Sequence, residues 1–220
     1  MKYILVNDFS HLLKKKRLIL IYLILIFSNL LFKIFDFRNI LDDDYFITLG
    51  LMIDSNNYIS IITYILNIMF TIYLFFSIYT LSFKNNSENI FLRISIEKWS
   101  FLKVLSMFLI IIFIKLFLHT TALLIFKIIN IKIINNILFL LTDILLASII
   151  TLLTMILQLI INKNILNIVV LTVIILFSKY LNVVYLSNCL FLLFCVLIIF
   201  VLIYIILIRN LYTKLFERGE

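Results

Sequence analysis

Long apolar runs, separated by short polar segments, make up most of this chain. A helix needs about 20 residues to cross a hydrocarbon core of about 30 Å. Of six such runs, five reach that length or come close to it. The run at 165–181 is short for a full span. The pattern predicts six transmembrane helices, at 18–35, 58–83, 102–126, 137–161, 165–181 and 189–208.

Two further segments mix apolar and polar positions at helical spacing. Residues 2–13 read KYILVNDFSHLL, and the pattern predicts a helix that lies at the membrane surface. Residues 84–101 form the longest connection on the inner side, and Ser87 there is a suitable cap for a short helix. We expect that internal helix to end near Trp99, with the indole at the membrane interface, where tryptophan is common.

The composition requires a lipid environment. The chain of 220 residues is 65% hydrophobic and 14% charged, whereas soluble domains contain about 25% charged residues. It has no proline and 2 glycines, which favours continuous helices. Six spans use roughly 120–140 residues at about 20 residues each, which leaves no room for a separate soluble domain. Residues 1–220 are therefore predicted to form one transmembrane domain.

The distribution of the 19 lysines and arginines predicts the orientation. With the N-terminus inside, thirteen of them lie on the inner side, five lie outside, and Lys115 remains within a span. This bias follows the positive-inside rule, so both termini are expected in the cytoplasm. The fold class is therefore an all-α integral membrane protein. The net charge of +8 has the same explanation, and no nucleic-acid partner is expected.

The sequence lacks the motifs of several enzyme classes. The only glycines are Gly50 and Gly219, which excludes the glycine-rich phosphate loop and the dinucleotide fingerprint. The only histidines, His11 and His119, cannot form the zinc-protease motif. Cys189 and Cys195 lie in an apolar run and are expected to be packing residues. We therefore expect no catalytic site, no metal site and no cofactor in this chain.

Three ionisable residues lie inside predicted spans, where a charge is costly and often functional. Lys115 is near the middle of the third span, and His119 is one turn further on the same face. Asp143 lies in the fourth span, six residues from its outer end. His119 and Asp143 are at similar depth, so they are expected to meet across an antiparallel pair, and Lys115 can reach outward. The three residues line a transport path, form a charge-paired contact at a subunit interface, or link adjacent helices structurally.

The layout resembles the permease subunit of ABC type-2 exporters. The resemblance rests on the surface helix, the basic cluster Lys14–Arg17, six spans with both ends inside, and the internal segment Ser87–Ser106. That segment carries the family's spacing of basic positions, at Arg93, at Lys98 or Trp99, and at Lys103. The chain differs from the pattern in its weak outer hairpin between the last two spans and its short first external loop.

The resemblance implies a division of labour. This subunit would form the path for a peptide or lipophilic substrate, such as a bacteriocin, in the cytoplasmic membrane of a bacterium. A pair of separate ABC ATPases would bind ATP and Mg, and a second permease, identical or paralogous, would complete the complex. The internal segment would be the coupling helix that contacts the ATPase, with the residues Glu88, Arg93, Glu97, Lys98 and Trp99.

Two other functions stay open at this point. The first is a secondary transporter or the substrate-binding membrane subunit of an uptake system, which predicts activity without an ATPase or broken helices around a binding site. The lack of proline and the scarcity of glycine count against broken helices. A membrane-bound immunity or assembly factor is the other alternative. An adjacent ATPase gene would favour the exporter.

Overall fold

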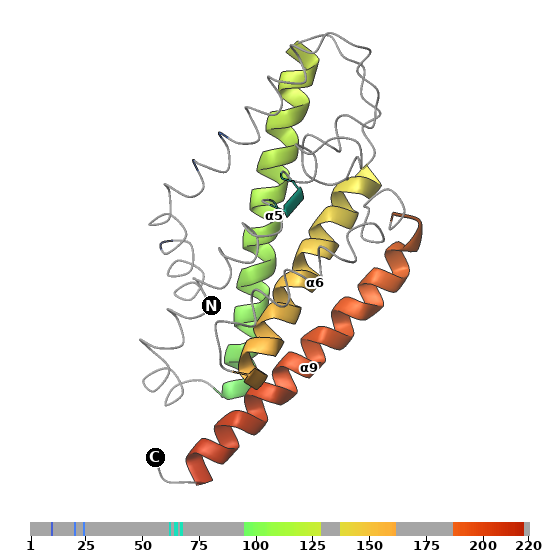
Figure 1. The fold of residues 1–220 in the computed structure, drawn as a ribbon. Coiled ribbons are helices and arrows are strands. Elements are labelled where there is room, and N and C mark those ends of the chain that lie inside the picture. Colours follow the sequence, from blue (N-terminus) through green and yellow to red (C-terminus); the bar gives the residue numbers. More distant parts are fainter. Residues whose placement is uncertain are drawn as a thin grey trace.

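The computed structural model describes residues 95–128, 137–161 and 187–217, together with the single positions 10, 20, 24, 62, 64, 65 and 67. The regular structure in these residues is helical (Figure 1). The elements are α5 (Ile96–Ile128), α6 (Ile137–Ile161), the short 3-10 turn η1 (Ser187–Cys189) and α9 (Leu190–Glu217).

Helix α5 is longer than the third predicted span. It begins at Ile96, where the amide of Trp99 donates to the carbonyl of Ser95 at 2.9 Å. Glu97 in the first turn interacts favourably with the positive end of the helix dipole. No proline or glycine interrupts the 33 residues, so the end of the predicted coupling helix and the third span form one continuous helix.

The other two long helices agree with the predicted spans at most of their ends. Helix α6 covers the predicted range 137–161 with its 25 residues. Helix α9 has 28 residues, begins one residue after the predicted start at 189, and continues from 208 to Glu217. No proline or glycine occurs within α9, so no residue in its final turns interrupts the helix.

Three of the described helices are long and apolar enough to cross a membrane, namely α5, α6 and α9. Helix α5 runs antiparallel to α6 and α9, and these two run parallel to each other (Figure 1). If six spans alternate in direction, the fourth and the sixth run parallel, and these two predicted spans correspond to α6 and α9. The expected surface helix, the spans at 18–35, 58–83 and 165–181, and the internal segment before Ser95 lie outside the described residues, apart from the single positions given above.

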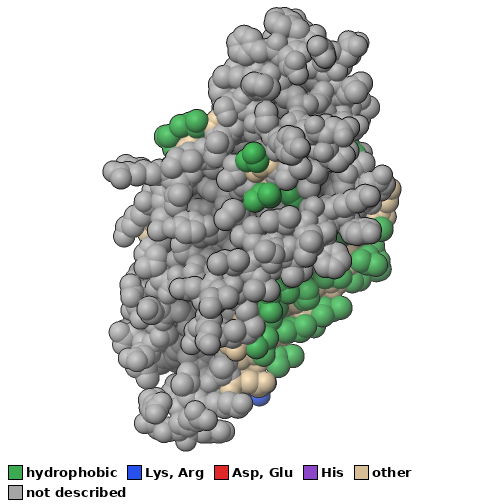
Figure 2. Space-filling model, in the orientation of Figure 1, with side chains coloured by type: hydrophobic (Ala, Val, Ile, Leu, Met, Phe, Trp, Pro, Cys, Tyr) green, Lys and Arg blue, Asp and Glu red, His purple; other side chains and the backbone are tan. Residues whose placement is uncertain are grey.

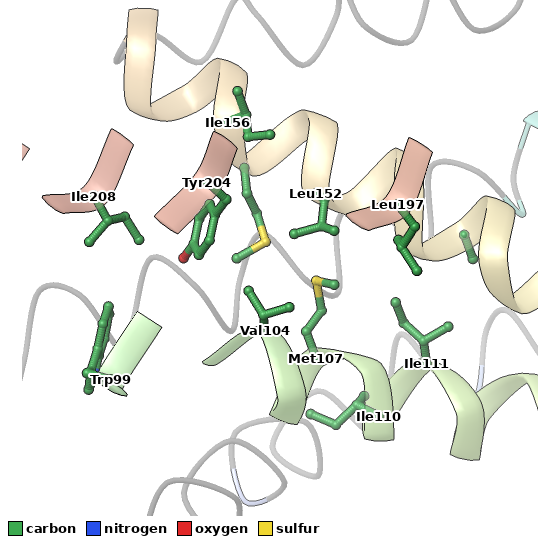
Figure 3. Close-up of a cluster of buried hydrophobic side chains, with 12 residues drawn as sticks. Trp99, Val104, Met107, Ile110, Ile111, Leu152, Ile156, Leu197, Tyr204 and Ile208 are labelled. Carbon is green, nitrogen blue, oxygen red and sulfur yellow. The ribbon is translucent and has the colours of Figure 1, made fainter. Parts of the chain in front are cut away.

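The three long helices pack around one apolar core (Figure 3). Trp99, Tyr204 and Ile208 fill the end of the core where α5 begins and α9 approaches its C-terminus. In lipid, close van der Waals contact rather than removal from water stabilises such a core. The remaining fully or largely buried members are Val104, Met107, Ile110, Ile111, Ala147, Leu152, Met155, Ile156 and Leu197.

Helix α6 also buries small hydroxyl side chains. Ser148 donates to the carbonyl of Ile144 at 2.7 Å, and Thr154 donates to Thr151 at 2.7 Å. Thr151 donates within the same helix to Ala147 at 3.0 Å. Each hydroxyl is therefore satisfied by its own helix. Small side chains at buried positions let neighbouring helices approach closely.

One face of α9 is apolar and uncovered. Figure 2 shows a band of hydrophobic side chains along the edge of the molecule where α9 lies in Figure 1. Phe191 is 82% exposed there, and Leu192, Phe194, Ile199, Leu202 and Ile206 are exposed as well. Such a face is compatible with lipid and incompatible with water at this length.

Candidate functional site

Four polar side chains meet inside the bundle, and we call them the buried polar cluster: Asn67, Lys115, His119 and Asp143. The ammonium of Lys115 donates to Asp143 Oδ1 at 2.9 Å and to Asn67 Oδ1 at 3.2 Å. The second carboxylate oxygen, Oδ2, lies 3.3 Å from Nε2 of His119. One carboxylate thereby contacts two residues of α5, and Lys115 extends the contact to Asn67, one of the described helical positions 62, 64, 65 and 67.

The positions along the helices explain this meeting. Lys115 and His119 are four residues apart on α5 and so lie on one face, about one turn from each other. Asp143 lies in the second turn of α6, which runs antiparallel beside α5. Its short side chain reaches between the two α5 residues. The predicted contact between His119 and Asp143 is present. Lys115, one turn away on the same face of α5, contacts the same carboxylate.

The cluster is electrostatically costly if it is incomplete. The side chains of Lys115 and Asp143 are only 6% and 4% exposed. A buried ion loses its hydration, and a close partner offsets that loss only if good geometry and further hydrogen bonds are present. Here Asp143 has a partner on each oxygen, and Lys115 has Asn67 in addition to Asp143. With neutral His119, the charges of Lys115 and Asp143 sum to zero.

Tyr64 lies beside this cluster. It is in the same helical segment as Asn67, three residues earlier, so both side chains are on one face. The side chain is only 3% exposed. Among the residues that the structure describes, the Tyr64 hydroxyl has no hydrogen-bond partner.

The cluster does not have the composition of a metal centre. Within the described ranges, no group of three or more His, Cys, Asp or Glu side chains gathers where it could hold a metal ion. A lysine ammonium next to the carboxylate also occupies the place that a cation would take. What the arrangement can do is bind three helical segments together and present hydrogen-bond donors inside the membrane.

The residues predicted to contact an ATPase divide into three groups. Glu97 and Lys98 are exposed in the first turn of α5. Glu97 forms an ion pair with Arg209 of α9, with 3.1 Å between the carboxylate oxygen and the guanidinium nitrogen. Both side chains are more than half exposed. Trp99 is completely buried in the core, so its indole is not available on the surface for an ATPase to contact. Glu88 and Arg93 lie outside the described residues.

The burial of Trp99 has a local cause. The helix begins at Ile96 instead of ending near Trp99, so the indole falls on the face of α5 that packs against α9. The ammonium of the buried Lys103, one turn later, lies 5.9 Å from the centre of the indole ring. A cation at that distance is attracted to the ring face. Trp99 is therefore a packing residue, and the exposed docking candidates are Glu97 and Lys98.

Sequence reasoning did not single out Asn67, Tyr64 or Arg209. Asn67 and Tyr64 lie within the predicted span 58–83, where a buried amide or phenol needs a polar partner. That cost is the signal by which the sequence could have identified Asn67 and Tyr64. Arg209 follows the last apolar run, and nothing in the sequence shows that it lies near Glu97.

The regular structure in the described residues is helical, three of the helices are long and apolar enough to cross a membrane, and they enclose a charged cluster, which indicates a membrane protein. In comparisons with known proteins, the chain matches no family model, no curated protein and no solved structure. The resemblance to ABC type-2 permeases therefore remains an expectation that rests on the predicted topology and the internal segment.

Proposed function

We propose that this chain is the permease subunit of an ATP-driven exporter in a bacterial cytoplasmic membrane. It would form the translocation path together with a second permease, identical or paralogous, and a pair of separate ATPases would supply the energy. The predicted six-span topology and the internal segment suggested this function. The course of α5 is the structural observation that best supports it.

Helix α5 joins two features that a driven transporter needs. Its first turn exposes Glu97 and Lys98, a pair of charges that suits contact with a soluble protein. Eighteen residues later the same helix carries Lys115 of the buried polar cluster. At 1.5 Å per residue the two points are about 27 Å apart along one uninterrupted helix. A displacement at the exposed turn is therefore transmitted to the cluster without an intervening loop.

The first turn of α5 is also held by α9. The ion pair between Glu97 and Arg209 joins the two helices at the end that the charge distribution places in the cytoplasm. An ATPase that closes on binding ATP would move both helices together through this end. The transport cycle then consists of two arrangements of the bundle, with the cluster made in one and rearranged in the other.

Co-purification tests this proposal. A tagged chain expressed from its native operon is purified in mild detergent, and the complex is assayed for ATP hydrolysis. We expect a stoichiometric ATPase to co-purify. The double substitution Glu97→Ala and Lys98→Ala should release it, whereas Phe101→Ala, at an exposed apolar position of the same helix, should not.

The opposite results are equally informative. A chain that purifies alone, from cells that contain the whole operon, would contradict the proposal. An ATPase that stays bound to the Glu97 and Lys98 double variant would remove the first turn of α5 as its docking surface.

The ion pair between Lys115 and Asp143 favours one alternative, a secondary transporter. Paired ionisable residues inside the membrane are common on ion and proton pathways. This alternative predicts transport by the purified chain alone in proteoliposomes, driven by an ion gradient and without ATP. Transport that requires both the ATPase and ATP would exclude it.

A further inference from the structure

We infer that the ion pair between Lys115 and Asp143 is a latch that keeps the outer end of the bundle closed, while α6 parts from its neighbours at the opposite end. This inference rests on the exporter proposal, because it assigns the latch to the outer end of a translocation path. Three observations support it: the depth of the ion pair, the side chains that follow it on α6, and the different contacts at the two ends of α6.

The first observation is the depth of the ion pair. Trp99 of α5 packs beside Ile208 of α9 at one end of the core (Figure 3). Lys115 lies sixteen residues further along α5, which is about 24 Å at 1.5 Å per residue. Asp143 lies six residues after the start of α6, which is about 9 Å from that end of the helix. The ion pair is therefore near the end of the bundle opposite to Trp99, which the charge distribution predicts to face outward.

The second observation concerns the face of α6 that carries Asp143. Ala147, Thr151 and Thr154 follow at helical spacing on that face, and all three are buried. Both threonine hydroxyls donate to carbonyls of α6, so these side chains need no polar partner on a neighbouring helix. Small side chains of this kind leave room for a substrate when the helices part. The ion pair lies between these residues and the outer end of α6.

The third observation is that the two ends of α6 are held by different contacts. Asp143 contacts both Lys115 and His119 of α5 across the helix pair. Beyond it, the described hydroxyl side chains donate within α6, and apolar side chains pack against α5 and α9. Lipid chains replace apolar contacts, whereas a buried charge that loses its partner finds no substitute in lipid. The bundle therefore parts more readily at the C-terminal end of α6 than at the ion pair.

The test is the reaction of a single cysteine with methanethiosulfonate ethyltrimethylammonium, a charged reagent that does not cross membranes, added to the outside of intact cells. The full chain carries Thr151→Cys, and its native cysteines are replaced by serine. Thr151 is completely buried and lies eight residues, about 12 Å, from Asp143 towards the cytoplasmic end. We expect no reaction while the ion pair is present. Removal of both charges, with Lys115→Met and Asp143→Asn, should accelerate the reaction about tenfold or more, because a buried thiol reacts only when the helices open.

Two controls separate opening of the latch from general loosening of the bundle. His119→Leu leaves the ion pair intact, so a cysteine at position 151 should stay unreactive in that variant. Ile160→Cys, at a position that is 61% exposed and apolar, faces lipid and should stay unreactive with and without the ion pair. Reaction at position 160 after removal of the charges would mean that all of α6 has loosened, and it would overturn the inference.

An exchanged pair distinguishes charge from side-chain shape. Lys115→Asp together with Asp143→Lys restores opposite charges and should return the cysteine at position 151 to the unreactive state. An exchanged pair that reacts as fast as the uncharged pair would overturn the inference. So would reaction from the outside while the native ion pair is in place, a result that requires no change in the cluster itself.

The remaining outcomes separate the latch from the exporter. An unreactive cysteine in the folded, uncharged variant would make the cluster a structural link and overturn the latch. If an ATPase nevertheless co-purifies, the exporter proposal stays intact. The expected pattern of reactions in a chain that purifies without an ATPase would support the latch and reject the exporter.

Discussion

The ammonium of Lys115 lies 2.9 Å from the carboxylate of Asp143, and both groups are buried between α5 and α6. The same carboxylate contacts His119, and the same ammonium contacts Asn67. Three helical segments are thereby joined through one ion pair. Because each member has its charge or its hydrogen bonds met by another, the cluster should respond very differently to single and to paired substitutions.

Asp143→Asn is expected to destabilise the protein by on the order of 3 kcal/mol, because it leaves the ammonium of Lys115 buried without a counter-charge. The free energy of unfolding is measured by titration with SDS in mixed micelles. Unchanged stability would mean that Lys115 reaches water in the native protein.

The double variant Asp143→Asn and Lys115→Met should recover a large part of that loss, because neither charge is then buried. A double-mutant cycle over these two positions gives their coupling energy. A double variant that is less stable than Asp143→Asn alone would show that Lys115 contributes through packing and Asn67 instead of through charge.

His119→Leu should cost less than Lys115→Leu. His119 contacts Asp143 at 3.3 Å, and its loss leaves the carboxylate with the ammonium as a partner. Loss of Lys115 leaves a carboxylate without its permanent counter-charge. The two variants are compared by thermal unfolding in the same detergent. The reverse order would identify His119, in its protonated form, as the main counter-ion.

Trp99→Ala is expected to cost about 3–5 kcal/mol, because removal of a completely buried indole leaves a cavity between α5 and α9. Phe101→Ala is the matched control, two residues away on the same helix and exposed. It should cost much less, since lipid replaces the lost contacts. Equal losses at the two positions would contradict the packing of Trp99 against α9.

The surface ion pair between Glu97 and Arg209 should contribute little to stability. Both side chains are more than half exposed, and such pairs contribute about 0–1 kcal/mol. Glu97→Gln should therefore leave the unfolding transition nearly unchanged, in contrast to Asp143→Asn. A short bis-maleimide should nevertheless cross-link cysteines placed at 97 and 209, in a variant without the native cysteines. Absence of a cross-link would contradict the proximity of the two helix ends.

The elements that could be predicted from the sequence are those marked by a long apolar stretch. A largely apolar run of membrane length, with Asp143 as its one charged residue, predicted α6 at its observed bounds. The position of Asp143 relative to His119 followed from counting residues along an antiparallel pair. The inference about His119 and Asp143 succeeds because residue spacing fixes positions along a helix, and because a charge buried in lipid needs a nearby partner.

The features that were not predicted depend on details of packing. The pattern at 84–101 did not show where the helix begins, because polar residues such as Glu97 and Lys98 are compatible with both a loop and a first turn. Because α5 begins at Ile96, Trp99 lies on a buried face of that helix, which the pattern did not predict. The approach of Arg209 to Glu97 joins residues more than one hundred positions apart, and no pattern along the chain encodes it.

The hydroxyl groups of α6 have a mechanical consequence. Ser148, Thr151 and Thr154 donate to carbonyls of their own helix. Sliding of α6 along a neighbouring helix would break none of the hydrogen bonds that these side chains make. Around these three residues α6 therefore resists sliding through the packing of core side chains such as Leu152, whereas Asp143, nearer its N-terminal end, is held by its ion pair with Lys115. Helix α6 is thus held by charged partners near its N-terminal end and by packing alone along the rest of its length. This arrangement allows the helix to pivot about Asp143.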